Sequence, residues 1–180
     1  MGLVLLLSLL VGQFIRWFLP NTTRMSARSR LQAFGAQILG RLRADSCERL
    51  PGGMWILAKP DQTLLVIQTP RGRTRAAAYG WNGGAGLKRY ELPSDWLQSQ
   101  GIQPSADLLE PLALGSTHLE KWLVDLKDLK ASRSWGQVEG FELSALPNSS
   151  SQIGKVQIRF RLEEKATGRP VVFEQGICLP

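Results

Sequence analysis

The sequence predicts an α+β protein in which a long N-terminal helix packs on an antiparallel β-sheet head. Residues 1–50 hold an apolar run followed by an amphipathic helical stripe, and residues 51–180 hold short β-prone runs separated by turn-forming residues. With 180 residues, the chain is long enough for one compact domain and an appended segment. We therefore expect an apolar transmembrane or filament-core helix over 1–20, its amphipathic continuation over 21–50, and a β-rich head over 51–180.

The first 15 residues have only Ser8 and Gln13 as polar interruptions, so a helix here is apolar on all sides, as a membrane segment must be. Fifteen helical residues reach roughly 22 Å, whereas a hydrocarbon core is about 30 Å thick, so the segment is short for a full span. The residues expected to form the membrane or filament anchor are Leu3, Val4, Leu5, Leu6, Leu7, Leu9, Leu10, Val11, Phe14 and Ile15.

Three interpretations of this segment stay open. A cleaved secretory signal needs a basic start and small residues at the cleavage site, and the sequence offers neither. A free-standing anchor is the second interpretation, and the arginines behind it favour a cytoplasmic head. In the third, translation begins upstream of Met1, and the added residues complete the span.

An amphipathic stripe follows the apolar run. Leu31, Phe34, Ile38 and Leu42 recur at steps of three and four, which predicts that this face of the helix packs on a sheet. Pro20 removes one helical hydrogen bond, so we expect a kink between the two halves of the helix.

Four β-prone runs, "MWILAK", "TLLVIQT", "RTRAAAYGW" and "LKRYELP", follow "LPGG" and are separated by Gly, Pro, Asn and Asp turns. The segment 94–130 is consistent with short helices, and "HLEKWLVDLKDLK" fits a helix although its second half fits a strand equally well. Near the C-terminus, "KVQIRFRLEE" alternates apolar and polar residues and returns through "VVFEQGICLP", which predicts a hairpin with one solvated face.

The net charge of +7 is unevenly distributed, because the first 49 residues contain seven arginines against Asp45 and Glu48. The head is therefore close to neutral. Within it, a basic group could contact nucleic-acid phosphates, although a solvated turn is the favoured interpretation. This group consists of Arg71, Arg73, Arg75, Lys88 and Arg89.

Cys47 and Cys178 are the only cysteines and form the one candidate disulfide. Cys47 lies off the apolar stripe and Cys178 is out of phase with its apolar neighbours, so the pairing is not favoured. With His118 as the only histidine, and with no nucleophile, phosphate-loop or metal-helix motif, we expect no metal, no cofactor and no enzyme activity.

Three stretches carry a resemblance to a known family: "ARSRLQAFGAQILGRLRADSCERLPGGMWILAKPD", "YGWNGGAGLKRYELP" and "KVQIRFRLEEKATGRPVVFEQGICLP". Their order resembles type IV pilin-like proteins, and it is most similar to the minor pilins and J-type minor pseudopilins of type II secretion. The shared pattern includes a helix that ends in an Arg-Asp pair, here Arg43 and Asp45, and a strand that ends in an aromatic residue before a Gly-rich turn.

This resemblance implies a pilin-like fold and a structural role as a minor filament subunit. The N-terminal helix is then held first in the bacterial inner membrane and later in the filament core, with the head in the periplasm or on the filament exterior. The implied partners are other pilin-like subunits and the inner-membrane assembly platform. The processing site of the family, a basic leader ending in Gly with a Glu soon after it, is not matched, since Gly2 is followed by leucines and valine. A start upstream of Met1 accounts for this departure.

Two other functions stay open beside the filament subunit. One is a single-pass membrane-anchored binding protein with its head on either side of the membrane. The other is a minor pilin of a DNA-uptake system that binds nucleic acid through the basic group.

Overall fold

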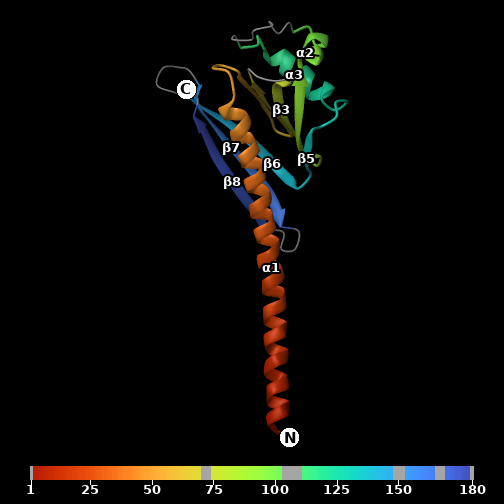
Figure 1. Ribbon diagram of the computed structural model, residues 1–180, viewed down its shortest axis with the longest axis vertical. Helices are drawn as coiled ribbons and strands as arrows, with labels where there is room; N and C mark the ends of the chain where they lie inside the picture. Colours follow the sequence, from red (N-terminus) through yellow and green to blue (C-terminus); the bar gives the residue numbers. More distant parts are fainter. Residues whose placement is uncertain (1, 70–73, 103–110, 148–152, 165–168, 179–180) are drawn as a thin grey trace.

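The computed structural model describes residues 2–69, 74–102, 111–147, 153–164 and 169–178, and within α1 the side chains of 11–16 and 27–47. Helix α1 (Gly2–Cys47) is one continuous helix. Its second half lies along the sheets, and its first half extends well beyond them, with the N-terminus at the far end (Figure 1). The helix runs uninterrupted through Pro20, where a kink was expected, because proline removes a single helical hydrogen bond.

A five-stranded antiparallel sheet, sheet A, has the order β1-β2-β3-β4-β5. The four predicted runs form its first four strands, and a fifth, short strand was not expected. The strands are β1 (Met54–Lys59), β2 (Gln62–Gln68), β3 (Thr74–Asn82), β4 (Gly86–Pro93) and β5 (Arg133–Trp135). Strands β1 to β4 pair in sequence order, and β5 pairs with β4 although a long segment of the chain separates the two.

A second antiparallel sheet, sheet B, has three strands: β6 (Val138–Pro147), β7 (Ile153–Glu164) and β8 (Arg169–Cys178). The predicted C-terminal hairpin is the β7–β8 pair, in which Phe160 stands opposite Phe173. Two short helices, α2 (Ser94–Ser99) and α3 (Ser116–Asp125), lie between β4 and β5 of sheet A along the chain. Within the segment 94–130, where short helices were expected, residues 103–110 lie outside the described residues.

The predicted fold, a pilin-like α+β arrangement with a long kinked helix on one antiparallel sheet, is wrong. The protein is a small mixed α/β protein with two antiparallel sheets, and the part of α1 that packs on them is the amphipathic, non-apolar stretch 27–47. Sheet A is not half-solvated, because β2 is buried on both faces. The continuous apolar run "LLVI" in β2 is typical of such a strand, whereas a half-solvated strand alternates.

The main hydrophobic core lies where α1 and both sheets meet. Leu31, Ile38 and Leu42 of α1 are buried in it, and Phe34 is half-buried at its edge. Two hydrogen bonds join the sheets beside this core: the Trp81 indole donates to the Val138 carbonyl at 3.1 Å, and the Thr63 hydroxyl donates to the Phe141 carbonyl at 3.0 Å. The helix therefore packs on two sheets that are also hydrogen-bonded to each other.

A second core lies on the opposite face of sheet A, beneath α2 and α3. Its largest member is Trp122 of α3, which is fully buried and meets Trp96 of α2 edge to face, with ring centroids 5.2 Å apart. Helices thus cover one face of sheet A, and α1 with sheet B covers the other.

Among the described residues, no helix combines the length and the apolarity needed to cross a membrane.

Gly35 is the point of closest approach between α1 and sheet B. A Cβ built on it would lie 2.3 Å from Cζ of Phe173, whose ring stacks on Phe160 with centroids 5.1 Å apart. Gly35→Ala is therefore expected to lower the free energy of unfolding by about 1 to 2 kcal/mol, because the clash outweighs the better helix propensity of alanine. Chemical denaturation of the full-length chain in a nonionic detergent measures this.

Gly40 supplies the matched control, since it lies in the same helix with nothing within 4 Å of a built Cβ. Gly40→Ala is expected to raise the free energy of unfolding by about 1 kcal/mol, from helix propensity alone. Equal effects of the two substitutions would contradict the packing of the Phe173 ring on α1.

Candidate functional site

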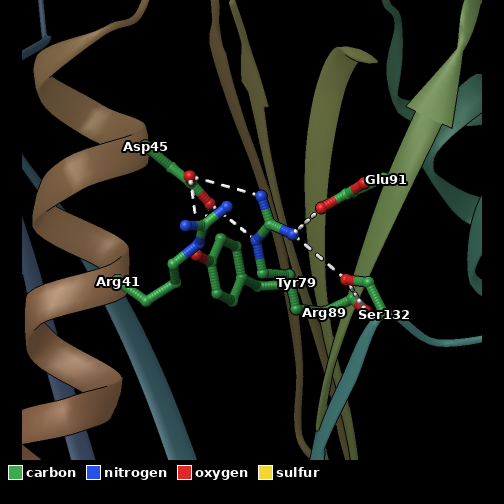
Figure 2. Close-up of polar contacts among 6 residues, drawn as sticks. All are labelled: Arg41, Asp45, Tyr79, Arg89, Glu91 and Ser132. Carbon is green, nitrogen blue, oxygen red and sulfur yellow. Dashed lines mark hydrogen bonds and ion pairs between the residues drawn. The ribbon is translucent and has the colours of Figure 1, made fainter. Parts of the chain in front are cut away.

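A buried carboxylate joins the end of α1 to sheet A. Asp45 lies three residues after Leu42, on the same helix face, and only 6% of it is exposed. Its Oδ2 accepts a hydrogen bond from the Tyr79 hydroxyl at 2.6 Å and one from Arg89 Nε at 2.7 Å. The Oδ1 atom accepts a hydrogen bond from Arg89 Nη2 at 3.3 Å, so the guanidinium and the carboxylate form a bidentate pair (Figure 2).

The guanidinium of Arg89 is itself almost completely enclosed. Its Nη1 donates to Glu91 Oε1 at 2.6 Å and to Ser132 Oγ at 3.0 Å. Ser132 also binds the backbone of Arg89, because its backbone N–H and its hydroxyl both donate to the Arg89 carbonyl. We call this cluster the Asp45 clamp; its members are Asp45, Tyr79, Arg89, Glu91 and Ser132. The clamp connects α1, β3, β4 and the segment before β5 (Figure 2).

The environment of the clamp shifts the pKa values of Tyr79 and Arg89. Burial, together with the neighbouring Asp45 carboxylate, raises the pKa of Tyr79 well above its usual value. Burial alone would lower the pKa of Arg89, but the hydrogen bonds to Asp45 and Glu91 outweigh it and raise that pKa. At neutral pH the tyrosine is therefore a neutral donor and the arginine a cation.

Both carboxylate oxygens of Asp45 and all three nitrogens of the Arg89 guanidinium take part in hydrogen bonds within the clamp. Arg41 reaches Asp45 Oδ1 from the solvent side at 3.5 Å, and its side chain is 44% exposed. Such an exposed pair contributes little to stability. The arrangement is suited to holding the helix end and the sheet in one relative position.

The predicted nucleic-acid contacts do not form one surface in the part of the chain that the structure describes. Arg89 is 4% exposed and ion-paired with Asp45, so its guanidinium lies inside the clamp and not on the surface. Lys88 is half-buried and points to the opposite face of sheet A. Arg71 and Arg73 lie outside the described residues, as does the side chain of Arg75.

The predicted anchor is described in part. Val11, Phe14 and Ile15 lie on the section of α1 that extends beyond the sheets, and they are 52%, 59% and 47% exposed. The side chains of Leu3, Val4, Leu5, Leu6, Leu7, Leu9, Leu10 and Pro20 lie outside the described residues. Three large apolar side chains are therefore open on one short helical section.

The other candidate residues show no assembled site. Cys47 is exposed and carries a free thiol, and the side chain of Cys178 lies outside the described residues. Over the described ranges, no group of three or more His, Cys, Asp or Glu residues could hold a metal ion. His118 lies in the first turn of α3, where its Nδ1 accepts a long hydrogen bond from Gly115 N–H.

The Asp45 clamp was missed in the sequence, although one signal for it was present. Asp45 continues the apolar stripe at the spacing of a buried position, and a carboxylate there needs a partner. The identity of the partner depends on strand register, because Arg89 stands opposite Tyr79 only through the pairing of β3 with β4.

Comparisons with protein-family models, with curated proteins and with solved structures each gave no match.

Proposed function

We propose that this chain is a structural subunit of a filament of the type IV pilus or type II secretion pseudopilus class, and that it assembles through its N-terminal apolar helix. The observation that carries the proposal is the exposed apolar surface of Val11, Phe14 and Ile15 on the extended part of α1. Leaving such side chains in water costs about 1.5 to 3 kcal/mol each, so this section favours burial against other helices or lipid.

The sequence extends this apolar surface toward the N-terminus, since residues 3–10 are leucine and valine except for Ser8. A helix that is apolar on all sides can exchange lipid for the equivalent helices of neighbouring subunits while it stays buried. The proposal therefore has two steps: the helix is held in the bacterial inner membrane, with the head on the periplasmic side, and then enters the filament core. Its partners are other pilin-like subunits and the inner-membrane assembly platform.

The Asp45 clamp supports this role mechanically. A subunit that is assembled into a filament through its helix needs a head that stays attached to that helix. The clamp joins the last turns of α1 to β3 and β4 through charge-assisted hydrogen bonds in a buried site, next to the packed Leu42. The head would then follow the helix as one unit.

Phe14→Asp tests the proposal. Placing an aspartate in an apolar helix environment costs about 3 kcal/mol, so incorporation into filaments is expected to fall about 100-fold. The measurement is quantitative cross-linking of the full-length chain to neighbouring pilin-like subunits in cells of its host. Val172→Asp is the matched control, because Val172 is 44% exposed on β8 of the head, and the same change there is expected to leave incorporation unaltered.

Protease accessibility of the head in spheroplasts is the second arm of the test. A head that is cleaved from outside supports the filament subunit. A protected, cytoplasmic head would overturn the proposal in favour of a membrane-anchored binding protein. Normal filament incorporation of Phe14→Asp would overturn the role of the helix surface.

A further inference from the structure

A pocket of about 210 Å³ opens on the α3 side of sheet A, away from the Asp45 clamp. Its floor is formed by β2, β3 and β4, and its wall by the end of α3 and the residues that follow. The space exists because Gly80 continues the face of Ala76 and Ala78 beyond the cover of Trp122 and has no side chain to fill it. We call it the Lys88 pocket.

Two lysines line this space. Lys88 stands directly opposite Gly80 in the sheet, and Lys127 lies two residues after the end of α3. Neither ammonium group has an ion-pair partner among the described residues, whereas Lys59 nearby pairs with Glu120 at 3.2 Å. Two unpaired cations at one opening favour an anionic ligand.

The remaining lining is apolar with a few polar groups. Leu123, Leu126 and Tyr90 line the pocket together, and Tyr90 is 5% exposed and has no side-chain hydrogen bond within the described ranges. Burial raises the pKa of Tyr90, so its hydroxyl is a neutral donor at neutral pH. The amide of Gln62 adds one adaptable hydrogen-bonding group.

We propose that the Lys88 pocket binds a small carboxylate with a flat apolar body, such as an aromatic monocarboxylate. The apolar body lies between the Tyr90 ring and the two leucines, and the carboxylate meets Lys88 and Lys127. The size agrees, since an apolar cavity of about 150 Å³ accommodates benzene. This binding site goes beyond the proposed filament role and does not depend on it, because every lining residue belongs to the head.

Benzoate is the probe, titrated into the full-length chain in a nonionic detergent while the backbone amide signals of Gly80 and Lys88 are followed by NMR. A ligand of this size is expected to bind with a Kd of about 1 mM. Benzyl alcohol has the ring without the charge, and inorganic phosphate has the charge without the ring. Each is expected to bind about tenfold more weakly than benzoate.

Three variants complete the test. Lys88→Gln and Lys127→Gln are each expected to weaken benzoate binding about tenfold, and Lys121→Gln, an exposed lysine of α3 outside the pocket, is expected to leave it unchanged. Gly80→Val is expected to abolish binding by filling the floor, at little cost in stability, because a Cβ there meets only Tyr90 Cε2 at 3.6 Å.

The proposal is overturned if benzoate causes no saturable shifts, or if benzyl alcohol or phosphate binds as tightly as benzoate. It is also overturned if binding survives in Gly80→Val, because benzoate would then occupy another place. None of these outcomes bears on filament assembly, which is read out separately by cross-linking.

Discussion

Asp45→Asn is expected to lower the free energy of unfolding of the full-length chain by about 3 to 5 kcal/mol, measured by chemical denaturation in a nonionic detergent. The substitution keeps the shape of the side chain and removes the charge. Arg89 is 4% exposed and would keep its positive charge in a buried site, with only Glu91 and Ser132 as partners. The cost arises mainly because the half-exposed Glu91 is then the only carboxylate of the clamp that pairs with this buried charge, whereas the polar contacts of the amide replace part of the lost hydrogen bonding.

Two further variants separate charge from packing. Glu91→Gln removes the other acidic partner, whose side chain is 47% exposed, and is expected to cost less than about 1 kcal/mol. The double variant Asp45→Leu with Arg89→Met removes both buried charges and is expected to recover much of the stability lost in Asp45→Asn. A loss below about 1 kcal/mol in Asp45→Asn would show that the clamp does not hold α1 to sheet A.

Ile38→Ala is expected to lower the free energy of unfolding by about 3 kcal/mol in the same measurement. Ile38 is fully buried between α1 and the two sheets, and its truncation leaves a cavity that the sheets, already joined to each other, cannot close. Gln37→Ala is the matched control: the neighbouring side chain is exposed, and a change within about 0.5 kcal/mol is expected there. Similar losses in both variants would mean that α1 does not pack on the sheets through the Ile38 face.

Asp45→Asn and Ile38→Ala both test whether the head stays attached to α1. The proposed filament role depends on this attachment. Ile38 and Asp45 lie about two helical turns apart on one face of α1, the first held by apolar packing and the second by the buried ion pair. If either attachment is lost, the apolar end of the helix remains but no longer controls where the head lies. Filament incorporation of Asp45→Asn, set beside that of Phe14→Asp, would therefore separate loss of helix contacts from loss of head attachment.

Elements with a strong local pattern were predictable, and an element with an interrupted pattern was not. β1 and β4 match their predicted runs closely, because turns of Gly, Pro, Asn and Asp bound them in the sequence. β6 was missed, because a register shift between Val138 and Gly140 places Val138 and Phe141 on the same buried face three residues apart. An irregularity of this kind disrupts the period of two by which a strand is recognised.

Local chemistry in the chain was enough to decide where β1 to β4 of sheet A begin and end, and which face of residues 27–47 is buried, since hydrophobic period and turn residues act over a few neighbours. Three features required long-range contacts: the division of the strands into two sheets, the pairing of Asp45 with Arg89, and the Lys88 pocket. Residues 44 positions apart meet in that ion pair only because the register of β3 with β4 and the seating of α1 bring them together. An arginine in an alternating strand has the same local signature whether it faces water or a buried carboxylate, so its burial is a property of the folded chain.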